Sequence, residues 1–253
     1  MKRFDDTTEL LLQLGDSAMI QAQRLCELVG GAPALEEEVA LMNVGLDLVG
    51  QARNWLDYAA ERIDDGRTAD DLVFLRDQSE YRNLLLVEQP NGDFAMTMAK
   101  QFLFDAWHKP LLEKLCNSSD ERIAGIAAKS IKESSYHIRR SSEWVKRLGD
   151  GTPESHERMQ RALDQIWHFT FELAKPYELF NTLDTASIAP GVNDLCKDWQ
   201  AIVATTFAEA TLTQPETAEN NFLSGREGLH SESLGFILAE MQFLQRAYPN
   251  ASW

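Results

Sequence analysis

Apolar residues recur every three or four positions along most of this chain, and that spacing places them on one face of an α-helix. The first segment of this kind ends before Gly30 and Gly31, since a glycine commonly follows the last turn of a helix. The second runs from about Glu36 to Arg62 and begins with three consecutive glutamates, which suit the positive end of a helix dipole. Both are expected to be long amphipathic helices. Their apolar lines are Leu11, Leu14, Ala18, Leu25 and Leu28 in the first and Leu41, Val44, Leu48, Trp55 and Tyr58 in the second.

Two further long helices follow a less regular stretch. The first of these is expected from about Phe94 to Leu115 and the second from about Glu121 to Leu148. Pro110 lies inside the earlier one and has no N–H to donate to Ala106, so we expect a kink or a local break near His108.

The rest of the chain is also expected to be helical. Thr152 and Pro153 read as the N-cap and first residue of a fifth helix that reaches about Lys175. Two more helices are expected near residues 192–212 and 232–247, and residues 214–233 are expected to form a loop. No segment alternates with the period of two that a half-buried strand requires. We therefore expect an all-α fold, a four-helix bundle with additional C-terminal helices, that forms a single domain over residues 1–253.

Composition narrows the possible functions. Hydrophobic residues make up 44% of the chain and charged residues 25%, the mixture found in soluble globular proteins. The formal net charge of −16 argues against a surface for nucleic acid or for an anionic membrane. A basic run near residues 129–147 is most simply a solvated helix face, and the alternative is a patch for an acidic partner or a phosphate-bearing ligand. It comprises Lys129, Lys132, Arg139, Arg140, Lys146 and Arg147.

The location expected for the protein is the cytoplasm. No apolar stretch approaches the roughly 20 residues that a membrane span needs, and the first residues lack the apolar core of a signal peptide. Cys26, Cys116 and Cys196 are far apart and form no C-x-x-C pair, which argues against disulfides and against a zinc site. We expect the three cysteines to be buried packing residues.

Polar residues interrupt the apolar lines of all four long helices at similar depth. Burying one amide or hydroxyl without a partner costs about 1–3 kcal/mol, so such residues need a bound ion, water or one another. A polar layer across four helices points to a site or to the remains of one. The inward positions are Gln21 and Gln51 in the first two helices, Gln101, Asp105 and His108 in the third, and Ser130, Ser134, His137 and Ser141 in the fourth.

A di-iron carboxylate site in a helical bundle takes a carboxylate from each of two helices and a Glu-x-x-His pair from each of the other two. Here the pair that ends at His137 begins with Ser134, and Glu133 lies about 100° away around the helix. Only Asp105 and His137 are candidate ligands, with His108 as a third. The structural interpretation, a site that has lost its metal, is preferred. The alternative is a stand-alone iron-dependent oxygenase that uses Asp105, His108 and His137.

Several stretches of the sequence resemble the structural, non-catalytic subunits of the bacterial phenylacetyl-CoA 1,2-epoxidases, which are multicomponent monooxygenases. The stretch from Lys132 to His137 fits the same family, and the similarity extends over nearly the whole chain. The most specific stretches are residues 45–61, GLDLVGQARNWLDYAAE; residues 83–94, NLLLVEQPNGDF; residues 228–235, GLHSESLG; and residues 238–242, LAEMQ.

The resemblance implies a ferritin-like fold and a hetero-oligomer with a related catalytic subunit that holds the di-iron centre. It also implies other oxygenase components, among them a flavin and iron–sulfur reductase, in phenylacetate degradation. This chain itself is expected to hold no cofactor and no catalytic residue, and it could form a homodimer when alone. The catalytic subunit's ligand positions correspond to Gln21, Leu48, Gln51, Asp105, Ser134 and His137 in this sequence.

Other interpretations find less support. One alternative that the sequence leaves open is a helical protein that binds a small molecule in the polar layer. The chain has no Gly-rich phosphate loop, no G-x-S-x-G motif and no H-E-x-x-H motif, which argues against nucleotide binding, a serine hydrolase and a zinc protease. Candidate contacts with a partner are the region from His108 to Pro110, the loop 220–232 and Trp253.

Overall fold

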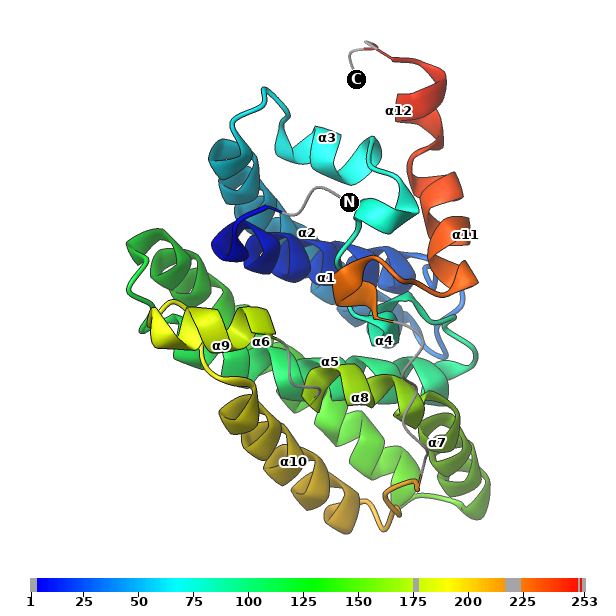
Figure 1. The fold of residues 1–253 in the computed structure, drawn as a ribbon. Coiled ribbons are helices and arrows are strands. Elements are labelled where there is room, and N and C mark those ends of the chain that lie inside the picture. The colour runs from blue at the N-terminus through cyan, green and yellow to red at the C-terminus, as the bar shows by residue number, and fades with distance from the viewer. Residues whose placement is uncertain (1–3, 175–177, 217–223, 250, 252–253) are drawn as a thin grey trace. The chain divides into compact units, whose positions relative to one another are not determined.

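A computed structural model describes residues 4–174, 178–216, 224–249 and 251. The chain forms two compact units: residues 1–90 together with 221–253 make the first, and residues 91–220 make the second. Among the described residues the ordered elements are helices, and the one β-type pairing is an isolated bridge between Ser224 and Leu229 (Figure 1). The all-α class predicted from the periodicity is confirmed, and the expectation of a single domain stays a prediction.

Two long helices form the body of the first unit. Helix α1 (Asp6–Cys26) packs along α2 (Leu35–Ile63), as their blue ribbons show in Figure 1. The predicted apolar lines face this contact, because Leu11, Leu48 and Trp55 are fully buried. A Cβ at Gly15 would lie 2.6 Å from a side-chain carbon of Leu56, so glycine is what lets the two helices approach here.

Short elements from both ends of the chain complete the first unit. Helix α3 (Ala69–Phe74), the 3₁₀ turn η1 (Gln78–Glu80) and α4 (Leu85–Glu88) follow α2. After the 3₁₀ turn η3 (Gly225–Glu227), helix α11 (Glu232–Met241) contacts α1, α4 and η1, and α12 (Phe243–Ala247) follows it. The single helix expected over 232–247 is therefore divided, at Gln242.

Helix α5 (Phe94–Leu115) is the centre of the second unit. It contacts α6 (Glu121–Gly149), α7 (Pro153–Ile166) and α10 (Val192–Glu209), and nearly all of its residues from 97 to 112 are buried. The helix continues through Pro110 without interruption, so the local break expected near His108 is wrong. The hydrogen bond that Pro110 cannot donate to Ala106 lies in the last turns of the helix. Leu111, Leu112 and Leu115 are fully buried there, and their packing keeps the backbone helical.

The fifth helix is shorter than expected. Thr152 is its N-cap, as predicted, and accepts a hydrogen bond from the Ser155 backbone N–H at 3.2 Å. The α-helix ends at Ile166 and is followed by the 3₁₀ turn η2 (Trp167–Thr170) and α8 (Phe171–Ala174), while Lys175 lies outside the described residues. Helix α9 (Glu178–Thr185) was not predicted.

Two further expectations can be compared with the structure. No helix in the described part of the chain is long and apolar enough to cross a membrane. The cysteines are not core residues, since Cys26 is exposed and Cys116 and Cys196 are half-buried. That prediction is wrong because each cysteine lies close to a helix terminus, where side chains are less enclosed. Cys26 ends α1, Cys116 follows α5, and Cys196 lies near the start of α10.

Candidate functional site

The polar positions picked out by the helical period are all buried. Their exposed fractions do not exceed 3%, whereas Glu133, the neighbour of Ser134, is only half-buried, as its position on the helix predicts. Two of these positions lie on α1 and α2 in the first unit, and the others lie on α5 and α6 in the second. The single polar layer inferred from the sequence stays a prediction, and each unit is considered separately. The buried positions are Gln21, Gln51, Gln101, Asp105, His108, Ser130, Ser134, His137 and Ser141.

Asp105 is the only one of the nine with a carboxylate. Its Oδ2 accepts a hydrogen bond from the Ser141 hydroxyl at 2.7 Å, which joins α5 to α6. Burial raises the pKa of Asp105 to about 8, and the hydrogen bond from Ser141 offsets only part of that effect. Asp105 is therefore mainly a neutral carboxylic acid at pH 7.

His108 lies one turn further along α5 and is also neutral. Its ring stacks on Phe104 with the ring centroids 5.0 Å apart. Burial, with a smaller contribution from the nearby His137 on α6, lowers the pKa of His108 to about 3. The side chains of Asp105, His108 and His137 are thus all enclosed in the second unit, but they add no negative charge to it near neutral pH.

Two other polar positions of the second unit, Gln101 and Ser134, are poorly satisfied. Arg140 approaches the Gln101 carbonyl oxygen at 3.5 Å, at the limit of a hydrogen bond. The Ser134 hydroxyl and the Gln101 amide nitrogen are buried without a hydrogen-bond partner among the described residues. These buried groups could bond to a ligand or to water, but most of them are neutral.

In the first unit, the positions that correspond to metal ligands of the catalytic subunit carry uncharged side chains, namely Gln21, Leu48 and Gln51. Neither polar atom of the Gln21 amide has a hydrogen-bond partner among the described residues, and Leu48 offers no ligand atom. Gln51 is an amide where a di-iron helix would carry a histidine.

This donor set does not fit a pair of iron cations. Hard cations need carboxylate oxygens to balance their charge, and the six corresponding positions contain one carboxyl group, Asp105, which is held in its neutral form. Within residues 4–174, 178–216, 224–249 and 251, no three His, Cys, Asp or Glu side chains are grouped closely enough to hold a metal ion.

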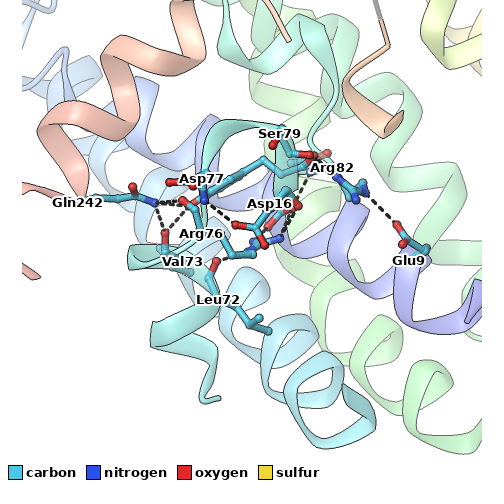
Figure 2. Close-up of polar contacts among 12 residues, drawn as sticks. Glu9, Asp16, Leu72, Val73, Arg76, Asp77, Ser79, Arg82 and Gln242 are labelled. Carbon is cyan, nitrogen blue, oxygen red and sulfur yellow. Dashed lines mark hydrogen bonds and ion pairs between the residues drawn. The ribbon is translucent and has the colours of Figure 1, made fainter. Parts of the chain in front are cut away.

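A second polar cluster, which the periodicity did not reveal, lies in the first unit around Asp16 of α1 (Figure 2). The Asp16 carboxylate accepts hydrogen bonds from the Arg76 guanidinium, one of them at 3.1 Å, and from the Arg82 backbone N–H at 2.8 Å. The Arg82 side chain donates to Glu9 at 2.9 Å. Both ion pairs are almost completely buried, so they fix the irregular segment after α3 against α1.

Gln242 connects the C-terminal helices to this cluster. Its amide nitrogen donates to the backbone carbonyl oxygens of Val73 at 2.8 Å and Arg76 at 3.0 Å, and it lies 3.3 Å from the Tyr81 hydroxyl. These bonds hold the chain at the point where α11 ends and α12 begins.

Glu88 is the centre of a third cluster, in the same unit. Its carboxylate accepts hydrogen bonds from His230 Nδ1 at 2.8 Å, from Asn83 at 2.9 Å and from the Ser231 backbone N–H at 2.7 Å. The other ring nitrogen of His230 lies 3.0 Å from the Tyr81 carbonyl oxygen. Both ring nitrogens of His230 therefore face oxygen atoms of the first unit.

Sequence reasoning overlooked the residues of the Asp16 and Glu88 clusters as a group. A usable signal was present, because Asn83, Glu88 and His230 all lie in the stretches that carry the family resemblance. These two stretches, 83–94 and 228–235, are brought together at the Glu88 cluster. The clusters join segments that are far apart in the sequence through buried hydrogen bonds and therefore act as structural ties.

Comparison with known proteins supports the resemblance seen in the sequence. A family model described as "Phenylacetic acid catabolic protein" matches residues 2–253. One of the subunits of the 1,2-phenylacetyl-CoA epoxidase of Escherichia coli strain K12 is 47% identical over 246 residues, which cover 97% of this chain and 98% of that protein. The predicted resemblance and the predicted ferritin-like helical fold class are both confirmed.

Proposed function

Since this chain belongs to the family of phenylacetic acid catabolic proteins, we propose that it is the non-catalytic structural subunit of a phenylacetyl-CoA epoxidase. In this proposal it binds and stabilises a related catalytic subunit, which holds the di-iron centre, in phenylacetate degradation. The complex works in the cytoplasm and receives electrons from a flavin and iron–sulfur reductase.

The observation that carries the proposal is the side-chain chemistry at the ligand positions. Four of the six, Gln21, Leu48, Gln51 and Ser134, have no ionisable group. The fifth, Asp105, is neutral near pH 7 because its burial raises its pKa to about 8. A cation would have to displace that proton and the hydrogen bond from Ser141 before it gained its first carboxylate.

The role of this chain is then mechanical. A permanent partner removes apolar helix faces of the catalytic subunit from water and shifts that subunit towards its folded state by mass action. Such a pair should bury more than about 2,000 Å² of surface in total. The buried polar clusters around Asp16 and Glu88 suit this role, because they fix the segment after α3 against α1 and the segment before α11 against α4.

Co-expression with the related subunit tests the proposal. The partner should be recovered in soluble, active form in a complex with this chain, and it should be less soluble when expressed alone. Equal solubility and equal activity of the partner alone would contradict a stabilising role.

The alternative is a stand-alone oxygenase that uses Asp105, His108 and His137. The same expression experiments distinguish it from the structural role. Iron content and turnover are measured on this chain purified without the partner. Stoichiometric iron that supports turnover in the chain alone would favour the oxygenase and overturn the structural role.

A further inference from the structure

Helix α2 has a second apolar line, on the side that faces solvent. The buried line of the same helix, through Leu41, Val44 and Leu48, packs within the protein, whereas the second line is largely exposed. Its members and their exposed fractions are Leu35 at 73%, Val39 at 45%, Met42 at 36%, Leu46 at 60% and Val49 at 37%.

The spacing of this line is that of a helix–helix contact. Successive members are separated by four, three, four and three residues, which is the alternation of a heptad seam. From Leu35 to Val49 the line extends about 21 Å at 1.5 Å per residue. Single exposed apolar side chains are ordinary on a protein surface, but a continuous row along four turns marks a site of interaction.

Gly50 adds an independent observation on the same helix. A glycine inside a helix is less favourable than alanine, and here nothing in the protein requires it, because a Cβ at Gly50 would meet no atom within 4 Å. Gly50 lies one turn after Leu46 and next to Val49, so its missing side chain leaves room for another helix to approach closely.

The charges of α2 indicate what kind of partner could bind to its exposed apolar line. The helix contains six acidic and two basic residues, and Glu36 near its start is exposed. An anionic membrane surface is thereby disfavoured, and a helix flanked by lysine or arginine is favoured.

We propose that this α2 line, Leu35 to Val49 with Gly50, is the surface against which a long helix of the related catalytic subunit packs. The inference rests on the proposed function, and the similarity to one of the subunits of an epoxidase argues for a related polypeptide as the occupant. The occupant helix has its own apolar line with basic residues at the edges.

Charged substitutions in the line test the proposal on the full chain. In the double variant Met42→Lys and Leu46→Lys the changed side chains are already exposed, so the chain should keep its helical content and its melting temperature. Its affinity for the co-purified catalytic subunit, measured by analytical ultracentrifugation, should fall by at least about tenfold, since central apolar side chains dominate most interfaces. The matched control is Leu75→Lys, which alters a side chain 50% exposed outside α2 and should bind within about twofold of wild type.

A second variant probes the close approach. Gly50→Gln adds a side chain into open space in the free chain, where it should raise the stability slightly, but it should weaken binding of the catalytic subunit. Wild-type affinity in both the lysine and glutamine variants, with a functional wild-type complex, would overturn the α2 surface and leave the proposed function standing.

Two other results have separate meanings. If the α2 variants abolish self-association of this chain while binding of the catalytic subunit is unchanged, the occupant is a second copy and the proposal is wrong. If the wild-type chain binds no related subunit at all, the proposed function itself fails.

Discussion

At the scale of single residues, this protein contains buried polar groups of two kinds. Asp16 and Glu88 each accept several hydrogen bonds from groups that are themselves buried, which is the arrangement that makes a buried charge tolerable. Gln21 and Ser134 are equally buried, but no described residue bonds to the Gln21 amide or the Ser134 hydroxyl. An unsatisfied group of this sort costs about 1–3 kcal/mol. The first kind stabilises the fold, and the second kind is what the proposed loss of a metal site would leave.

Replacing Asp105 by asparagine should change how stability depends on pH. The pKa of this carboxyl is raised from 3.8 to about 8 in the folded protein, so the folded state binds a proton that the unfolded chain releases within that window. Its contribution is complete below pH 3.8 and is lost as the pH rises towards 8, by at most about 1.4 kcal/mol per pH unit. Asp105→Asn keeps an acceptor for Ser141 and removes this loss.

Urea unfolding at about pH 5 and about pH 8 measures the effect. The difference in unfolding free energy between the two pH values should shrink in Asp105→Asn and stay as in wild type in Glu240→Gln, which alters an exposed carboxylate. An unchanged difference in Asp105→Asn would mean that Asp105 is ionised in the folded protein.

Removing the His230 ring should weaken the first unit. His230→Ala removes two buried contacts, to the Glu88 carboxylate at 2.8 Å and to the Tyr81 carbonyl oxygen at 3.0 Å, and leaving a buried group without its partner costs about 1–3 kcal/mol. His156→Ala is the comparison, because that ring is half-buried and bonds only the Gly149 carbonyl oxygen, a contact that contributes about 1 kcal/mol. Chemical denaturation of both variants checks the ranking, and an equal loss in the two would contradict a structural role of the His230 hydrogen bonds at Glu88.

At this scale the sequence predicted burial but not pairing. The helical period placed Gln21, Asp105 and His137 inside, and all three are buried. It could not show that Ser141 bonds Asp105, or that Glu88 meets His230 from 142 positions away, because such contacts depend on the tertiary fold.

At the scale of secondary-structure elements, the long helices were predictable and the short ones were not. The bounds expected for α5, Phe94 to Leu115, agree with the structure because Asp93 caps the first turn and the apolar residues persist to the end. The end of α7 at Ile166 was missed, since the following 3₁₀ turn involves Trp167, which packs on Trp199 from a distant helix. Local propensity does not contain that information.

The C-terminal helices supply a prediction at this scale. Gln242→Ala removes the hydrogen bonds to the Val73 and Arg76 carbonyl oxygens, so the junction of α11 and α12 should be held less firmly to the segment after α3, although Arg246 of α12 still bonds that segment. Amide hydrogen exchange in residues 232–247 should become faster, while exchange in α5 should not change. Gln245→Ala, three residues further on, should leave the exchange pattern as in wild type. Equal protection in the Gln242 and Gln245 variants would show that the Gln242 bonds do not hold these helices.

At the scale of the whole molecule, family membership and side-chain chemistry lead to the same account. The resemblance predicted from four stretches of sequence extends over residues 2–253. The surfaces for a partner were not predictable from it: His108 and Pro110, offered as contacts, are buried, and Trp253 lies outside the described residues. The sequence alone could not separate the two apolar lines of α2, because both have helical spacing and only the fold shows that Leu41, Val44 and Leu48 are buried while Leu35 and Leu46 are exposed.

The central claim is that this bundle holds too little negative charge to retain two iron cations and acts as a companion to a related subunit. Elemental analysis of this chain, purified after expression alone in iron-replete medium, measures it most directly, with the co-expressed complex as the reference. The account predicts substoichiometric iron in the chain alone and stoichiometric iron in the complex. Two iron atoms for each chain in the absence of any related subunit would contradict it.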